Sequence, residues 1–398
     1  MKNINCCQVV RLIFCLATFL PVGVSMAALD KFEPYAFARV LYDSNLFRVS
    51  NDDVRRDEED DTITHLGGGV EADLMLSRQH LLLDLEVDRA LYKDFDDLDH
   101  TRVDGRGTWA WQVGNLWSGN LGYGYQRKLS SFDEQFVREK DMRTTHSGFL
   151  DAGYQLHPDW RLSGGVVYND VSYQERDRLD RDSTGGVFSV QYRNTRNSRV
   201  GVRVKYTDND LREQDVLGIK VNNDYTETEI SGVFYWEGTG KSALEANLGY
   251  TEQSFDELDD RDYKGSTGRL TYYWKATGKT KVDFSIWRET STKSDEVTTY
   301  VLSKGASVRP NWSVTSKVTI FGDVSYVNDD FKAQNDIVTA LGGQRRDDDT
   351  WRAKIGTRWR PRQYLQLSLS YSRQDRDSSI DVRDYDVDQV DARAQFNF

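Results

Sequence analysis

Charged residues at every second position are the part of this sequence whose spacing could carry chemistry. Alternate side chains of an extended chain share one face, so each such row would present its charges to one surface. The acidic rows are Glu71, Asp73, Asp84, Glu86, Asp88 and Asp104, and the basic rows are Arg199, Arg203, Lys205, Arg352, Lys354 and Arg358. Such rows could orient dipolar solutes or hold an acidic or hydroxyl-rich polymer by several weak contacts. Alternatively, they only keep a polar interior hydrated and pair across strands.

Enzymatic signatures are absent from the sequence. There is no GxSxG elbow, HExxH pair, phosphate-binding loop or dinucleotide fingerprint, and the five histidines are scattered singly. We therefore predict no catalytic residues, no cofactor and no metal site. Catalysis at the rim of such a fold remains a minor alternative.

Eighteen segments of alternating polar and apolar residues would position these rows. They are expected at 35–43, 62–76, 79–92, 99–113, 116–129, 142–156, 159–174, 182–195, 198–210, 223–237, 240–254, 262–275, 279–292, 296–309, 312–328, 349–360, 363–376 and 383–398. Period-two alternation over long strands is typical of a transmembrane β-barrel. No long apolar run that could form a membrane-spanning helix follows the N-terminus. We predict an all-β, single antiparallel barrel of eighteen strands, with sixteen as the alternative count because Lys304 falls on the lipid-facing register.

The connections alternate in length, which sets the topology. Turns are predicted at Ser77-Arg78, Gly114-Asn115, His157-Pro158, 194–197, Gly238-Thr239, Thr277-Gly278, Pro310-Asn311 and Pro361-Arg362. The other connections are longer and mostly acidic. Short turns mark the periplasmic rim of such barrels and long loops the outside, so both chain ends are expected on the periplasmic side.

The N-terminus has the features of a secretory signal. Lys2 and Arg11 precede an apolar stretch, and a small-x-small site ends at Ala27, so we expect a signal peptide at 1–27 and the barrel at 28–398. All three cysteines lie inside that segment. Because a signal of this kind precedes the barrel, we expect the protein in the outer membrane of a Gram-negative bacterium.

One register of the strands is apolar and aromatic and is expected to face lipid. It comprises Leu81, Leu83, Leu85, Val87, Trp109, Trp111, Val113, Leu121, Tyr123, Tyr125, Leu365, Leu367, Leu369, Tyr371, Val390, Ala392, Ala394, Phe396 and Phe398. Trp and Tyr gather at the segment ends, where amphipathic rings sit at headgroup level. Outer-membrane lipid and lipopolysaccharide are therefore expected partners.

The net charge of −12 argues against nucleic acid as a partner. The acidic excess lies between strands, at 51–61, 94–99, 256–262 and 345–349. These loops could bind divalent cations that bridge to lipopolysaccharide, but charge runs of this kind are more often solvated surface.

The segment YAFARVLYDSNLFR at 35–48 resembles the first strand of the exopolysaccharide-operon outer-membrane protein family of EpsL and the wider family of β-barrel porins around it. The matching residues are Tyr42, Asp43, Asn45, Phe47 and Arg48. The resemblance implies an outer-membrane pore that gives an exopolysaccharide its path out of the cell, with periplasmic or inner-membrane export proteins as possible partners. A structural role, in which the motif caps and orients the first outer loop, is the preferred interpretation of these residues.

Three functions stay open from the sequence. The first is the polysaccharide path, the second a general or small-solute diffusion porin, and the third a structural or adhesive barrel whose outer loops matter most.

Overall fold

The computed structural model describes residues 32–50, 57–134, 138–212, 214–216, 219–257, 262–291, 301–331 and 346–398. The predicted signal peptide at 1–27 and part of the acidic segment at 51–61 lie outside these residues. Within the described residues, no helix is long and apolar enough to cross a membrane.

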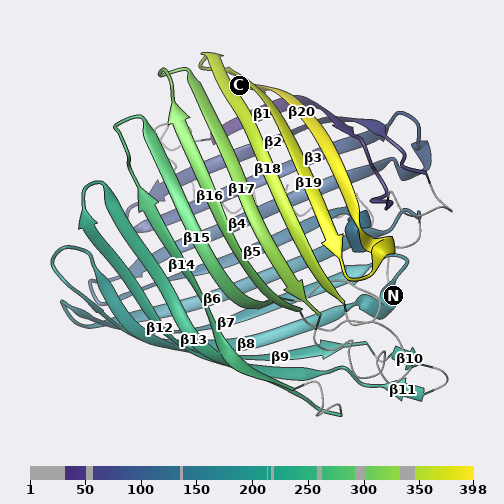
Figure 1. Cartoon of the computed structure of the whole chain (residues 1–398). Helices are drawn as coiled ribbons and strands as arrows, with labels where there is room; N and C mark the ends of the chain where they lie inside the picture. The colour runs from purple at the N-terminus through teal and green to yellow at the C-terminus, as the bar shows by residue number, and fades with distance from the viewer. Residues whose placement is uncertain are drawn as a thin grey trace, which may run out of the picture.

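Eighteen long strands form one antiparallel sheet (Figure 1). They are β1 (Phe32–Asp43), β2 (Asp61–Leu76), β3 (Gln79–Tyr92), β4 (His100–Val113), β5 (Trp117–Leu129), β6 (Met142–His157), β7 (Trp160–Tyr173), β8 (Arg181–Arg193), β9 (Arg199–Leu211), β12 (Tyr225–Thr239), β13 (Ser242–Phe255), β14 (Tyr263–Trp274), β15 (Thr280–Ser291), β16 (Val301–Ser313), β17 (Val318–Asp330), β18 (Asp347–Arg362), β19 (Leu365–Ser378) and β20 (Tyr385–Asn397). A separate short pair, β10 (Gln214–Val216) with β11 (Ile219–Val221), lies in the loop after β9.

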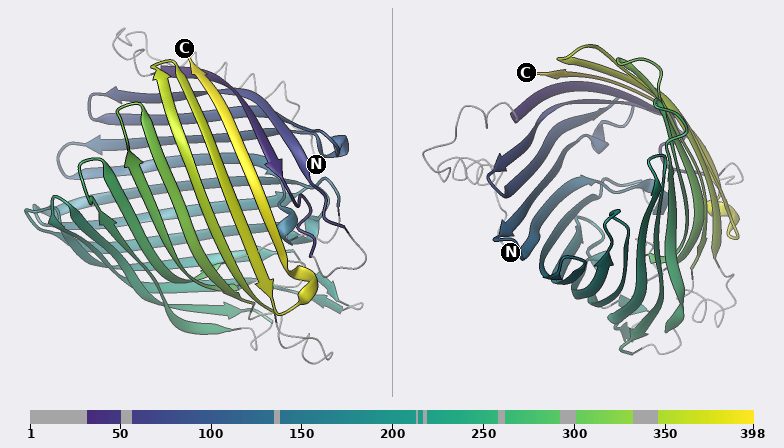
Figure 2. Two further views of the ribbon diagram at one scale, coloured as in Figure 1. Left: turned by 45° about the horizontal axis from the view of Figure 1, so that its top comes forward. Right: turned by 90° about the vertical axis from the view of Figure 1, so that its left-hand side faces the viewer.

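The sheet closes on itself. Each barrel strand pairs with its neighbour in sequence, and β1 pairs with β20 from Tyr35 opposite Asn397 to Asp43 opposite Gln389. In the right-hand view of Figure 2 the sheet curves round until the first and last strands lie side by side. Because closure leaves no unpaired edge, every strand satisfies its backbone groups inside the membrane. The predicted eighteen-stranded antiparallel barrel is confirmed, and the alternative count of sixteen is wrong.

Three predicted turns are misplaced, and two of them involve proline. Strand β16 continues through Pro310 to Ser313, so the chain reverses at 314–317, and β18 continues through Pro361 to Arg362. Proline has no backbone N–H to donate, so it usually interrupts a ladder. Here the cost is local: the pairing of β16 with β17 skips from Val308 to Asn311, and the pairing of β18 with β19 is irregular after Trp359. The turn predicted at Gly238-Thr239 also lies inside β12, and the chain reverses one residue later.

The two faces of the barrel follow the predicted registers. Leu81, Leu83 and Val87 of β3 are exposed on the outer face, whereas Glu86 and Asp88, on either side of Val87, form ion pairs inside. Exposed aromatic and aliphatic side chains recur on the outer face of nearly every strand. An apolar outer face around a polar interior is what a bilayer requires of a barrel.

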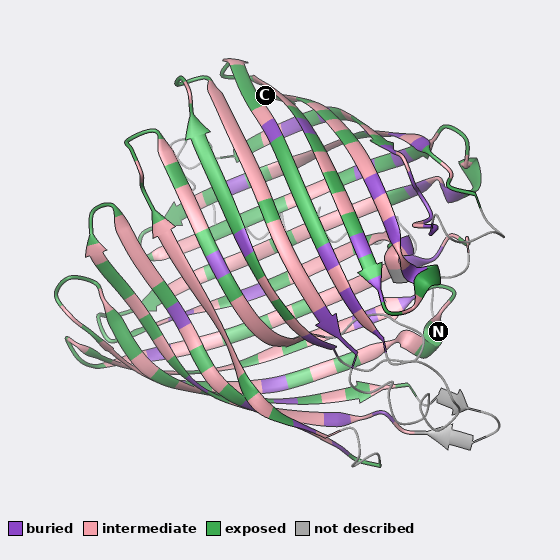
Figure 3. Ribbon diagram, in the orientation of Figure 1, coloured by how far each residue is buried: buried purple, intermediate pink, exposed green. Residues whose placement is uncertain are grey.

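Packing density differs between the two ends. Figure 3 shows buried residues gathering toward the long-loop ends of the strands. One apolar cluster at this end contains Leu46, Phe47, Val49, Ile63, Ala90, Leu98 and Phe132, and a second contains Tyr225, Phe255, Tyr263 and Leu302. The outer end is therefore the packed part of the barrel.

Aspartates close the outer loops. Among the described residues, four of these loops contain a single 3-10 turn: η1 (Asp96–Leu98), η2 (Phe132–Glu134), η3 (Asp177–Leu179) or η6 (Asp381–Arg383). In five connections between described strands, the aspartate just before the returning strand accepts a backbone N–H from the end of the preceding strand. The pairs are Asp99 with Tyr92 (2.8 Å), Asp180 with Tyr173 (2.7 Å), Asp224 with Leu211 (2.6 Å), Asp262 with Phe255 (2.9 Å) and Asp384 with Ser378 (2.6 Å). Part of the acidic excess of the loops thus has a structural use.

Candidate functional site: the lumen and its outer mouth

The predicted acidic rows lie side by side on three adjacent strands and face the lumen. Glu71 and Asp73 belong to β2, Asp84, Glu86 and Asp88 to β3, and Asp104 to β4. Glu71 lies directly opposite Asp84, and Glu86 directly opposite Asp104. The strand alternation therefore brings together carboxylates that are up to 33 residues apart in sequence.

Part of this acidic wall is neutralised by two arginines that the sequence analysis did not single out. Arg102 of β4 pairs with Asp88 (2.6 Å) and Glu86, and Arg393 of β20 reaches Glu86 (2.8 Å). His65 Nδ1 lies 2.7 Å from Asp88, which is 2 % exposed. Such a buried carboxylate needs these partners, because an unpaired charge at this depth would be strongly destabilising.

Glu71 and Asp84 remain outside this network. No hydrogen bond or ion pair joins either carboxylate to another described residue, and the two line a hollow of about 500 Å³ together with Glu33 and Asp73. Asp73 is engaged by His80 at 2.7 Å. The acidic wall therefore keeps two carboxylates without an ion pair to a described residue in its periplasmic half, although Arg106 is the cross-strand neighbour of Asp84 and lines the same hollow.

Two of the three cations in the basic row of β9 are compensated by carboxylates. Arg203 pairs with Glu229 (3.0 Å) and Lys205 with Glu227 (3.5 Å), both on β12, while the Arg199 guanidinium lies 5.0 Å from the centre of the Tyr235 ring. These contacts match the alternative in which lumen charges pair across strands.

The basic row of β18 is different. Arg352 donates to the neutral amide oxygen of Gln374 (2.8 Å), and Arg358 lies 5.7 Å from the centre of the Phe321 ring. Asp323 is the cross-strand neighbour of Lys354, but that carboxylate is bound by Arg309 at 2.9 Å. Among the described residues, none of these three cations has a carboxylate partner, so the row faces the lumen with its charge uncompensated.

Acidic and basic groups meet in one sector of the wall. A second hollow, of about 390 Å³, is lined by Glu71, Asp84, Arg102 and Arg106 on one side and by Arg358 and Arg393 on the other. Strands β18 to β20 supply one side and β2 to β4 the other, and β1 joins them. A solute that carries both charge and hydroxyl groups would meet hydrogen-bonding partners of both signs there.

The outer mouth is built around the residues that carry the family resemblance. The segment 44–50 after β1 packs Leu46, Phe47 and Val49 against lumen-facing Ile63 and Ala90. The Phe47 ring lies edge-on to the rings of Phe95 and Phe132, with centroids 4.9 Å apart in both cases. The segment thus folds inward along the wall, and its apolar side chains fill the space beside β2 and β3.

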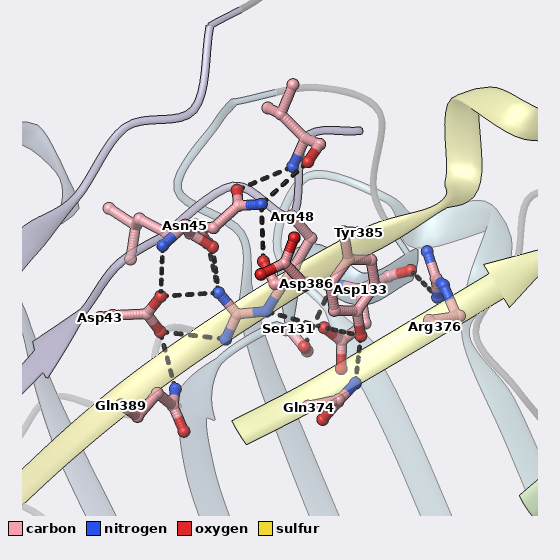
Figure 4. Close-up of polar contacts among 12 residues, drawn as sticks. Asp43, Asn45, Arg48, Ser131, Asp133, Gln374, Arg376, Tyr385, Asp386 and Gln389 are labelled. Atoms are coloured by element: carbon pink, nitrogen blue, oxygen red, sulfur yellow. Dashed lines mark hydrogen bonds and ion pairs between the residues drawn. The ribbon is translucent and has the colours of Figure 1, made fainter. Parts of the chain in front are cut away.

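Polar contacts fix this segment to the first and last strands (Figure 4). Asn45 is fully buried, donates to the carbonyl oxygens of Val49 (2.8 Å) and Asp386 (3.1 Å), and accepts from the Val49 N–H (2.9 Å). Gln389 of β20 donates to Asp43 at 2.7 Å. The buried amide of Asn45 therefore has its main hydrogen bonds satisfied by backbone of two distant parts of the chain.

Arg48 is the centre of the mouth. It adopts a left-handed backbone conformation (φ 55°), which aims its guanidinium back at Asp43 in a two-point contact of 2.9 and 3.0 Å. Its Nε also lies 3.2 Å from Asp133 of η2 (Phe132–Glu134), the short turn after β5. Tyr385 donates to the same Asp133 oxygen at 3.0 Å, and Arg376 donates to the Asp133 carbonyl oxygen at 3.0 Å. Arg48 and Asp133 therefore link the first, third and last outer loops.

The electrostatics of Asp133 favour its ionised form. Burial by itself would raise the pKa of the Asp133 carboxyl, but the guanidinium groups of Arg48 and Arg376 and the Tyr385 hydroxyl outweigh it and hold the pKa below its usual range. The link is consequently an ion pair at neutral pH.

Four of the five motif residues take part in this arrangement, and Tyr42 does not. Tyr42 points outward from β1 and is exposed, as its even position in the strand requires. Asp133, Arg376 and Tyr385 could not be chosen from the sequence, because nothing in their local pattern shows that separate loops meet at the mouth. Arg102 and Arg393 carried a usable signal, since both fall on the lumen register of their predicted strands.

No group of three or more His, Cys, Asp or Glu side chains suited to a metal ion occurs in the described part of the chain. The candidate site is therefore the charged lumen together with its packed mouth.

Comparison with known proteins agrees with this architecture. A family model described as "Putative beta-barrel porin 2" matches residues 236–398. No curated protein sequence matches the chain.

Several solved structures share the fold. OccK2 (OpdF) of Pseudomonas aeruginosa has a TM-score of 0.50 and 12% identity, covering 93% of this chain and 98% of that one. The outer membrane protein opdK of the same organism has a TM-score of 0.51 and 12% identity, with coverage of 93% and 100%. OccK2 has also been solved in complex with glucuronate, again at a TM-score of 0.50, with 11% identity and coverage of 92% and 98%.

The partial family match and the shared fold support a β-barrel of the porin kind, whereas the narrower resemblance to EpsL gains no support from them. The chain is an eighteen-stranded β-barrel of the Gram-negative outer membrane.

Proposed function

We propose that the protein is a diffusion channel for small anionic solutes, such as hydroxylated carboxylates. The observation that carries the proposal is the row Arg352, Lys354 and Arg358 on β18, which has no carboxylate partner among the described residues. Other lumen cations, such as Arg203 and Lys205, are paired with carboxylates. Uncompensated cations attract anions into a pore, and exchangeable contacts let them leave again.

Two further observations support a channel for small solutes. The family model that matches the C-terminal part is described as a porin. A protein of the same fold, OccK2, binds glucuronate, which combines one carboxylate with several hydroxyl groups. In this barrel, the hollow between Arg358 and Glu71 offers donors for a carboxylate and acceptors for hydroxyls. Passage of this kind needs no energy source in the protein itself, and we propose no enzymatic activity for it.

Ion selectivity tests the proposal. The purified full chain is placed in a planar bilayer with a salt gradient, and the reversal potential is measured for the wild type and for R352Q/K354Q/R358Q. We expect the triple variant to lose anion preference by about twofold or more in permeability ratio, since three uncompensated charges leave the lumen. The matched control R203Q/E229Q removes one paired cation with its partner and should leave the ratio nearly unchanged.

An unchanged reversal potential in the triple variant would show that the β18 row does not face the permeation path. Absence of any conductance, even after deletion of residues 44–50, would favour the structural or adhesive alternative instead.

The polysaccharide path is the weaker hypothesis. The segment that carries the resemblance is occupied by contacts at the mouth, which gives Asp43, Asn45, Phe47 and Arg48 a structural use. Deleting the gene separates the two functions: loss of small-anion uptake with unchanged surface polysaccharide supports the channel. Loss of polysaccharide export would revive the polymer path and, with it, a periplasmic partner at the tight-turn face.

A further inference from the structure

Two basic side chains lie opposite each other on the outer face of the barrel. Arg288 of β15 is the cross-strand neighbour of Lys304 of β16. Their neighbours in sequence point inward: Glu289 pairs with lumen-facing Arg269 at 2.6 Å, and Trp287 lies against the same guanidinium. Arg288 and Lys304 therefore face away from the lumen, as the strand alternation predicts for Lys304.

The register fixes the depth of this pair in the membrane. The next outward-facing positions toward the periplasm are Ile286 and Ala306, and Ala306 lies opposite Tyr326, whose ring is 4.9 Å from that of Trp351. Aromatic side chains of this kind mark the boundary between acyl chains and headgroups. Arg288 and Lys304 are the next lipid-facing positions toward the long loops. They lie three residues from the strand ends at Ser291 and Val301. The pair is consequently at the headgroup level of the outer leaflet.

Neither cation has an acidic partner in the part of the chain that the structure describes. Arg288 Nη1 donates to the carbonyl oxygen (2.6 Å) and the hydroxyl (2.7 Å) of Ser266, which orients the guanidinium without neutralising it. Lys304 is exposed and makes no ion pair with any described residue. Other outward cations at the same end are neutralised: Lys264 by Glu252 (2.7 Å), and Arg373 by Asp386 and Asp388 (3.0 Å each).

Such a pair is costly without a ligand. Like charges directly opposite each other on one sheet face repel, and charges on the lipid face of a barrel are unfavourable unless they lie near the interface. A phosphate placed between the two would remove both costs, because guanidinium and ammonium groups form short charge-assisted hydrogen bonds with phosphate.

We propose that Arg288 and Lys304 form a binding site for a phosphate group of lipid A, the membrane anchor of lipopolysaccharide. The occupant follows from the position of the pair. The outer leaflet of a Gram-negative outer membrane consists of lipopolysaccharide, whose phosphates lie at headgroup level. The lipid acyl chains would then lie along Ile286, Ala306 and the Tyr326 ring, directly below the two cations. The inference rests on the orientation of the barrel in the outer membrane and is independent of what the lumen transports.

Lipid binding to the purified full chain tests the site. Dissociation constants for bis-phosphorylated lipid A are measured in detergent by native mass spectrometry, with EDTA present so that divalent cations cannot bridge the lipid to carboxylates. We expect R288Q/K304Q to bind about tenfold more weakly than the wild type, since two charge-assisted contacts are lost. The matched control K264Q removes a paired outward cation and should stay within about twofold of the wild type.

Several results would overturn the proposal: unchanged binding to R288Q/K304Q, equal binding of dephosphorylated lipid A to the wild type, or equal affinity for phosphatidylglycerol. Heat-modifiable gel migration shows whether each variant is folded. If the double variant does not fold, K304Q alone should weaken binding about threefold and leave channel conductance unchanged. A conductance change without a binding change would contradict the site while leaving the channel proposal open to its own test.

Discussion

Substitution of Asp133 by asparagine should weaken the docking of the inward-folded segment 44–50 on the barrel wall. The Asp133 carboxylate accepts from Arg48 Nε at 3.2 Å and from the Tyr385 hydroxyl at 3.0 Å. A charge-assisted hydrogen bond contributes about 1.5 to 3 kcal/mol. Because 31% of the Asp133 side chain is exposed, the lower limit applies, and about 1.5 kcal/mol corresponds to about a tenfold larger undocked population. The two-point contact between Arg48 and Asp43 remains, so the segment should still dock most of the time.

Thiol labelling measures this population directly. Positions 32–398 contain no cysteine, so V49C provides a single thiol at a site that is 5% exposed when the segment is docked. We expect the labelling rate of V49C to rise about tenfold when D133N is added. D96N, which alters an exposed aspartate of η1, should leave the rate unchanged. Equal rates in V49C and V49C/D133N would refute the idea that Asp133 holds the mouth.

The same carboxylate predicts a pH dependence. A folded-state pKa below the usual value means that Asp133 stabilises the docked segment above the unfolded pKa, about 3.9. This stabilisation is lost as the pH falls through the depressed folded value. Protonation of Asp133 should therefore not change channel conductance between about pH 5 and about pH 8. The undocked population of segment 44–50 should rise only in stronger acid.

Three other predictions concern the stability of the barrel, measured as the free energy of unfolding in guanidinium titrations. R102Q should lower the free energy of unfolding by about 3 kcal/mol, because it leaves the buried Asp88 without its 2.6 Å partner. The control R106Q, whose side chain is 71% exposed, should lower it by less than about 1 kcal/mol. Equal effects of the two substitutions would contradict the argument. D99A should cost about 1 kcal/mol through the lost acceptor for the Tyr92 N–H, whereas the exposed neighbour D97A should be neutral. G67A should lower the free energy of unfolding by about 1 to 3 kcal/mol, because the new methyl group would lie 2.4 Å from the Val87 carbonyl oxygen. The control is G107A, where the nearest atom would be 3.9 Å away. An unchanged stability of G67A would show that β2 and β3 can separate locally.

The fold was accessible from the sequence because a barrel repeats one rule on every strand. Polar and apolar positions alternate as Glu86, Val87 and Asp88 do, and a slip of one residue would turn every charge toward lipid. The prolines were misleading for a local reason. Pro310 and Pro361 suggest turns, yet each lies near the end of a strand, where the ladder tolerates a missing N–H.

The candidate site was only partly accessible. Strand alternation places Arg352, Lys354 and Arg358 on the lumen side, but the partners of each charge depend on the register between strands. Arg393 and Glu86 are 307 residues apart and meet only because the last strand pairs with the first. The contacts at the outer mouth could not be predicted from the sequence, since loops such as the one carrying Asp133 have no periodic pattern that fixes their direction.

The position of the segment 44–50 has a consequence for assembly. Ser44 and Asp388 exchange hydrogen bonds of 3.0 and 2.8 Å, and Asn45 binds the Asp386 carbonyl oxygen, so the segment joins the first strand to the last. These partners are adjacent only after β1 and β20 have zipped together. A barrel whose seam is still open therefore lacks the surface on which the segment docks. Docking of the segment requires β1 and β20 to be paired, so a docked segment is a marker of a finished seam.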